Sequence, residues 1–254
     1  MLKKLLFLLM FTMSVNMFAA QDDRLDELPF DEEPLEENTK SYFAIAGGAT
    51  LSFMFVNFDD MNAFLTNKEN PAIPKQLEGP LLMTGGTGFT GVPWVPNLRV
   101  GVSGMAGTST VEYLVETNKK QVDYTVSSFG LNFDYGFVLT KSLALLPGVG
   151  VNFGSTTIEY INNGQDLPWG TPNDLTNSYI ARMNNDYIML QPSLNLEWAA
   201  LDYLAIRFGG GFSYQVNASE WTLNKNDKVT GAPDGLKLSA PYAQIGILVG
   251  LFNY

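Results

Sequence analysis

The stretch from residue 42 to residue 56 reads YFAIAGGATLSFMFV, and its side chains alternate in size with a period of two. Successive side chains of a β-strand point to opposite faces of the sheet, so this period is typical of a strand. One face of the predicted strand is bulky and the other is small. The bulkier register comprises Phe43, Ile45, Gly47, Ala49, Leu51, Phe53 and Phe55, and the smaller register Tyr42, Ala44, Ala46, Gly48, Thr50, Ser52 and Met54.

The same alternation recurs along the rest of the chain. It predicts seven further strands, at about 80–91, 97–113, 122–138, 142–160, 185–198, 202–217 and from 238 to the C-terminus. In 80–91, one register holds Leu81, Met83 and Phe89, and the other holds only small residues between Thr84 and Thr90. The sequence therefore predicts an all-β protein of about eight strands.

The connections between these strands alternate in length. Long or polar connections are expected at 57–79, 114–121, 161–184 and 218–237, and short ones at 93–96, 140–141 and 199–201. Long loops on one side and tight turns on the other are typical of outer-membrane barrels. We therefore expect an antiparallel up-and-down transmembrane β-barrel with a porin-like layout.

Charge is scarce in the predicted barrel. Residues 40–254 contain 29 charged side chains, about 13%, whereas a soluble domain has about 25%. No stretch after residue 20 has the roughly 18 consecutive apolar residues that a transmembrane helix needs. A soluble ligand-binding barrel remains an alternative, but its outside would need Lys, Glu and Asp, whereas the polar faces here carry mainly Gly, Ser, Thr, Asn and Gln.

Two segments precede the barrel. Residues 1–20 combine Lys3 and Lys4 with an apolar core and a small-residue end, which predicts a cleaved signal peptide. Residues 21–39 hold nine acidic residues against Arg24 and predict a disordered acidic leader. Residues 40–254 form the barrel. The protein is thus expected in the outer membrane of a diderm bacterium, where membrane lipid is its first partner.

Four charged residues fall within predicted strands, on the small-residue face. A charge facing lipid near the middle of the bilayer costs several kcal/mol, roughly 2 to 4 for arginine. We therefore expect these side chains to point into the lumen and to pair with one another. They are Arg99, Asp134, Glu197 and Arg207.

Strand number, loop alternation, interior charges and an aromatic last residue make residues 40–254 resemble the small outer-membrane barrels of the OmpX and OmpA transmembrane type. The last strand is similar to the C-terminal signal that the barrel-assembly machinery reads in such proteins. Leu248, Phe252 and Tyr254 match its alternation, whereas Gly246 and Gly250 depart from it. Whether Tyr254 or the register of Leu251 faces lipid stays open.

Catalytic and metal-binding motifs are not apparent in the sequence. The chain contains no histidine and no cysteine, which removes the usual general base and the thiolate ligands of metals. Residues 85–91, GGTGFTG, lack the lysine of a phosphate-binding loop. The barrel is also net acidic, which disfavours nucleic acid as a partner. We therefore expect no enzyme, no cofactor and no metal site.

The first long loop contains a helical pattern. Residues 59–67 place Met61, Phe64 and Leu65 at helical spacing, which predicts a short amphipathic helix over the barrel mouth. The leading functional hypothesis is a cell-envelope barrel with a narrow or closed lumen and a structural or surface-interaction role. The alternative is a transport or binding barrel for a small solute or apolar ligand, gated by this helix.

Overall fold

A computed structural model describes residues 42–65, 75–115, 118–163, 179–224, 227–232 and 236–253. Within these ranges the side chains of residues 64, 65, 115, 118, 163 and 179 are not described. The expected signal peptide, the acidic leader and Tyr254 lie outside the described residues. In the part of the chain that is described, no helix is long and apolar enough to cross a membrane.

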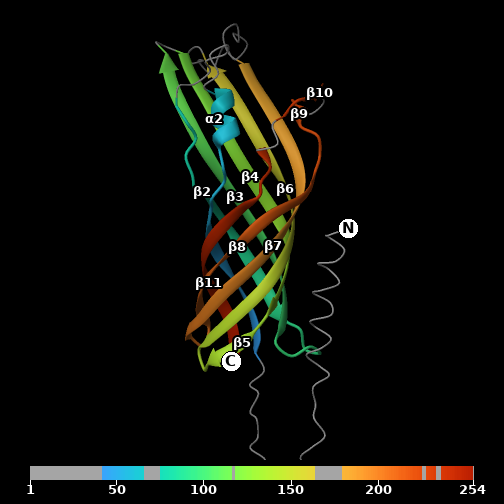
Figure 1. The fold of residues 1–254 in the computed structure, drawn as a ribbon. Coiled ribbons are helices and arrows are strands. Elements are labelled where there is room, and N and C mark those ends of the chain that lie inside the picture. The colour runs from blue at the N-terminus through green and yellow to red at the C-terminus, as the bar shows by residue number, and fades with distance from the viewer. Residues whose placement is uncertain are drawn as a thin grey trace, which may run out of the picture. The chain divides into compact units, whose positions relative to one another are not determined.

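The described chain forms a closed antiparallel β-barrel (Figure 1). Its eight wall strands follow the ring order β1–β2–β3–β4–β6–β7–β8–β11, and β11 pairs with β1 to close it. Chain neighbours are thus also wall neighbours, as predicted. The elements are β1 (Phe43–Met54), α2 (Asp59–Leu65), β2 (Leu81–Gly91), β3 (Leu98–Val115), β4 (Asn118–Tyr135), β5 (Phe137–Thr140), β6 (Leu143–Asn163), β7 (Tyr179–Leu201), β8 (Leu204–Ala218), β9 (Thr222–Leu223), β10 (Asp227–Lys228) and β11 (Ala240–Asn253).

One end of the barrel is built from tight connections. Six residues, 92–97, join β2 to β3, and two-residue turns at 141–142 and 202–203 join β5 to β6 and β7 to β8. Asn97 ends the first of these turns with φ at 65°, a left-handed conformation that asparagine tolerates better than most residues. Phe43 pairs with Asn253, so β1 starts and β11 ends at this same end.

A belt of apolar side chains covers the outside of the wall. On β4, β6 and β7 this belt stops between two adjacent rows of paired residues. The last apolar row is Phe129, Phe153 and Ile188, and the next row is Ser127, Ser155 and Asp186. Large apolar side chains that are exposed on the belt include Ile45, Leu131, Phe133, Val149, Leu194, Phe208, Ile247 and Leu251.

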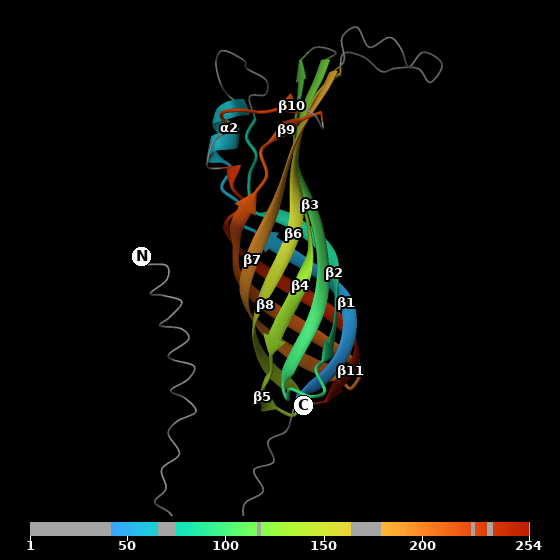
Figure 2. The same ribbon diagram turned by 90° about the vertical axis from the view of Figure 1, so that its right-hand side faces the viewer.

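Beyond the belt, four strands continue away from the tight-turn end (Figure 2). β3, β4, β6 and β7 are 18 to 23 residues long, so most of the expected loop 114–121 and both ends of the expected loop 161–184 are strand. Their outward side chains are mostly polar here, whereas their inward side chains are mostly apolar, as with Val122, Tyr124 and Ile158. The polar composition that suggested loops therefore marks one face of an extended sheet.

On β2 the two faces are reversed: the bulky register was expected to face outward, but it faces the lumen. Leu81, Met83 and Phe89 are buried inside, at 1%, 1% and 7% exposure. Thr84 and Gly88 occupy the outward register. These larger side chains fill the interior space near β2, whereas the outward register holds Leu82, at 47% exposure, followed only by threonine and glycine up to Thr90.

Candidate functional site in the barrel lumen

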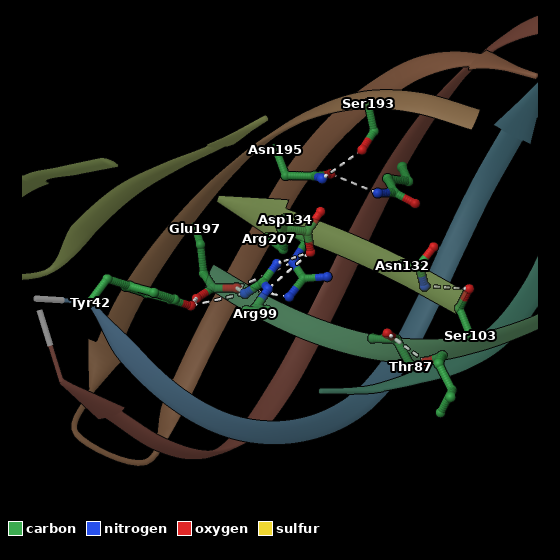
Figure 3. Close-up of polar contacts among 12 residues, drawn as sticks. Tyr42, Thr87, Arg99, Ser103, Asn132, Asp134, Ser193, Asn195, Glu197 and Arg207 are labelled. Carbon is green, nitrogen blue, oxygen red and sulfur yellow. Dashed lines mark hydrogen bonds and ion pairs between the residues drawn. The ribbon is translucent and has the colours of Figure 1, made fainter. Parts of the chain in front are cut away.

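Two arginine–carboxylate pairs meet in the lumen (Figure 3). Arg99 donates from Nε and Nη2 to Oδ2 of Asp134, at 2.9 and 2.8 Å. Arg207 donates from Nε and Nη2 to Oε2 of Glu197, at 3.2 and 2.8 Å. Each pair occupies directly opposite positions, on β3 and β4 or on β7 and β8. The structure thus brings together all four charged residues that were singled out from the sequence.

The two pairs are linked across the lumen. Arg99 Nη1 donates to Glu197 Oε2 at 3.0 Å, which connects β3 to β7. Arg99 and Glu197 are both fully buried, and Asp134 and Arg207 are each 8% exposed. A buried charge costs several kcal/mol unless a partner and hydrogen bonds compensate for it. The cluster contains two cations and two anions, so its formal charges balance.

Tyr42 and Phe89 complete the cluster, and neither was singled out from the sequence. The Tyr42 hydroxyl donates to Glu197 Oε1 at 2.7 Å and accepts from Arg99 Nη1 at 2.9 Å. The Phe89 ring centroid lies 4.0 Å from the guanidinium carbon of Arg99 and 4.9 Å from that of Arg207, within cation–π range. The sequence offers one weak signal for each: Tyr42 precedes small residues in its own register, and Phe89 lies in the glycine-rich stretch 85–91.

A polar layer lies next to the charged cluster. Amide side chains are hydrogen-bonded to one another and to hydroxyls, for example Asn152 to Gln191 and Gln244 to Asn195, each at 2.7 Å. Asn132 donates to the Ser103 hydroxyl at 2.8 Å. A cavity of about 60 Å³ remains among these groups. Its mostly polar lining and its size suit a few water molecules.

An apolar cluster fills the opposite part of the interior, and α2 belongs to it. Met61 is 3% exposed, and the ring of Phe58 packs edge-on against Tyr124 with centroids 5.2 Å apart. Asn62 exchanges hydrogen bonds with the backbone of Leu77 at 2.7 and 2.9 Å. The predicted helix therefore exists over Asp59–Leu65, and Asn62 anchors it to the segment before β2, whereas residues 66 and 67 lie outside the described residues. The side chains of Phe64 and Leu65 lie outside the described part.

The C-terminal strand turns its two registers in opposite directions. Leu248 is fully buried, and Phe252 packs against a second interior cluster near the tight turns. The register of Ile247, Val249 and Leu251 faces outward, with Leu251 68% exposed. The sequence left open which register of the last strand faces outward. The described residues place the register of Leu251 on the outer surface.

Asp166 and Asp174 of the expected loop 161–184, with Asp186 just after it, carry the oxygen ligands that Ca²⁺ prefers. Asp166 and Asp174 lie outside the described residues. Among the rest, no group of three or more acidic side chains is close enough to hold a metal ion. The charged cluster itself is occupied by its own hydrogen bonds.

Comparison with known proteins shows the fold. No protein-family model and no curated protein sequence matches the chain. A major outer membrane protein from Thermus thermophilus superposes with a TM-score of 0.50 and 11% identity, over 82% of this chain and 99% of that chain. Ail, the attachment invasion locus protein of Yersinia pestis, matches with a TM-score of 0.38 and 10% identity, over 84% of this chain and 99% of its own. The fold of this chain is thus similar to the fold of the Thermus thermophilus protein.

Proposed function

We propose that this protein is an integral outer-membrane barrel with a closed lumen and a structural or surface-interaction role in the cell envelope. The height of the apolar belt carries this proposal. From Leu143 to Phe153 the outward face of β6 is apolar, and these ten steps cover about 33 Å at about 3.3 Å per residue. A tilt of about 40° reduces this length to about 25 Å, the height of the apolar band of outer-membrane barrels.

The contents of the lumen support a closed barrel. The charged cluster crosses the interior between β3 and β7, and the apolar cluster around Met61 fills the other end. The cavity of about 60 Å³ between them has room for only a few waters, since each needs at least about 10 to 15 Å³. A hydrated solute would have to break buried ion pairs to pass.

The extended strands support a role at the surface. The outward face of β3, β4, β6 and β7 carries rows of hydroxyl, amide and charged groups beyond the apolar belt, such as Thr108 with Thr125 and Thr157 with Asn184. We place this end outside the cell and the tight turns in the periplasm. Export by residues 1–20 and insertion by the barrel-assembly machinery belong to the same proposal.

The proposal includes no catalytic activity. The chain has no histidine, and the buried arginines and carboxylates of the lumen are paired with one another in hydrogen-bonded ion pairs. A second candidate function is binding of an apolar ligand at the loop end, which a cavity of about 200 Å³ beside Met61 of α2 supports. Gating by α2 fits less well, because Phe58 and Met61 are held in the apolar cluster.

Two measurements test the proposal. Membranes containing the protein are washed with alkaline carbonate, and refolded protein is added to a planar lipid bilayer. We expect the protein to stay in the membrane pellet and the bilayer to remain without current steps. Release into the wash would refute membrane insertion, and stepwise currents would refute a closed lumen.

A further inference from the structure

A second cavity lies beside α2, separate from the charged cluster and the polar layer. Its volume is about 200 Å³, and it is bounded by α2, by the inward faces of β6 and β7, and by segments that follow β8 and β10. Figure 2 shows α2 at the same end of the molecule as β9 and β10. The side chains that line it include Met61, Ile158, Met183, Trp221, Val229 and Leu236.

The lining of this cavity is apolar. Met61 and Ile158 are buried at 3% and 2% exposure and form its floor. The polar side chains among the lining residues, Asp60 and Thr230, belong to exposed residues and lie towards solvent. A polar or charged ligand would lose its hydration in this cavity without gaining hydrogen bonds from the floor, which costs several kcal/mol. The chemistry therefore selects an uncharged, apolar ligand.

The volume of the cavity limits the size of that ligand. An apolar cavity of about 150 Å³ in a protein interior stays dry and binds benzene, whereas sites for drug-sized molecules measure about 300 to 1,000 Å³. At about 200 Å³, this cavity matches one ring, two small fused rings or a short alkyl chain.

The methionines favour an aromatic ligand. All six methionines of residues 40–254 lie in the apolar cluster or pack against it, and Met61 and Met183 line the cavity directly. Methionine is unbranched and polarisable, so it adapts its shape to a guest and makes favourable sulfur–aromatic contacts. Trp221, which is half-buried at the cavity, adds a ring against which an aromatic guest can stack.

We infer that this cavity binds a small uncharged aromatic molecule, taken up from the side of the barrel that carries α2. The inference rests on the proposed function, since that side is the outer surface only if the barrel is inserted as proposed. The ligand enters past Gly231 and Ala232, which are exposed at the cavity. The ligand need not pass through the lumen to bind, because the cavity and the charged cluster lie on opposite sides of the polar layer.

Trp221 provides the reporter for the test. The variant Trp94→Phe, Trp169→Phe, Trp198→Phe keeps Trp221 as its only tryptophan, and it is refolded into lipid vesicles and titrated with bromobenzene, a heavy-atom quencher. We expect saturable quenching of Trp221. A matched variant that keeps only the lipid-facing Trp198 reports bromobenzene dissolved in the bilayer, and its quenching should rise without saturation.

Filling the mouth of the cavity should abolish the saturable quenching of Trp221. In the Trp221-only protein, Ala232→Phe places a ring at the mouth, and Ala63→Phe makes the same change at an exposed position of α2 outside the lining. We expect saturation to disappear in the first variant and to persist in the second. Non-saturable quenching of Trp221, or saturation that survives Ala232→Phe, would refute the site.

Flotation of the vesicles separates failure of this inference from failure of the proposed function. Protein that floats with the vesicles but shows no saturable quenching would contradict the ligand site alone. Protein that does not float with the vesicles would contradict membrane insertion, whatever the quenching shows.

Discussion

Arg99 and Glu197 lie 98 residues apart in the sequence and meet in the lumen, where Arg99 Nη1 donates to Glu197 Oε2 at 3.0 Å. The contact joins β3 to β7, which are separated in the wall by β4 and β6. Each residue also pairs with a charged neighbour on the adjacent strand. The interior charges therefore brace the barrel across its width as well as along its wall.

The balance between the two arginines and the two carboxylates should affect the stability of the barrel more than any single hydrogen bond of the cluster does. Glu197→Leu leaves Arg99 and Arg207 against Asp134 alone, and breaking a buried pair in this way costs about 3 to 5 kcal/mol. Adding Arg207→Leu removes the excess cation and leaves the Arg99–Asp134 pair. We expect the double variant to be more stable than Glu197→Leu, as measured by urea unfolding in lipid vesicles. Additive losses would contradict this balance.

The Tyr42 hydroxyl should stabilise the barrel because it bonds to both Glu197 and Arg99. A hydrogen bond to a charged group contributes about 1.5 to 3 kcal/mol, so Tyr42→Phe should lower the unfolding free energy by about this amount. Tyr135→Phe is the matched control, since that hydroxyl accepts one long, exposed hydrogen bond of 3.5 Å from Asn97 among the described residues. Equal effects of the two changes would contradict a special role for Tyr42.

Alternation within strands was enough to predict much of the fold and of the charged cluster. Arg99, Asp134, Glu197 and Arg207 each fell on a small-residue face, and the cost of exposing charge to lipid placed that face inside. The number of strands and the antiparallel ring followed from the same pattern and from the loop lengths, and the structure confirms both.

Local alternation could not supply the rest, because it defines two faces without saying what each one touches. On β2 the large side chains of Met83 and Phe89 point inward, since the packing of distant strands leaves space there. On β4 the outward face changes from apolar at Phe129 to polar at Ser127, so the surroundings of one face differ along a single strand. Tyr42 reaches Glu197 only through a pairing register that no local pattern specifies.

The height of the apolar belt predicts where a charge is tolerated. Val149 lies on the outward face within the belt, whereas Ile180 is exposed on the outward face of the extended part of β7. Val149→Arg should cost about 2 to 4 kcal/mol in vesicles, the range for arginine near the middle of the bilayer. Ile180→Arg replaces an apolar side chain that faces water, so it should lower the unfolding free energy by less than about 0.5 kcal/mol. Similar costs at both sites would show that lipid does not contact Val149.

Two glycines on β2 should differ in how well they tolerate the same added methyl group. A Cβ at Gly85 would collide with the backbone oxygen of Gly104, and strands on both sides prevent that carbonyl from moving away. A Cβ at Gly88 would meet its nearest atom at 4.0 Å, an ordinary contact. We expect Gly85→Ala to lower the unfolding free energy by about 1 to 3 kcal/mol, the usual cost of overpacking. Gly88→Ala should be neutral or stabilising, because alanine restricts the unfolded chain. Heat-dependent migration on gels and urea unfolding would both measure the difference, and a tolerated Gly85→Ala would mean that β2 and β3 do not approach so closely in the folded barrel.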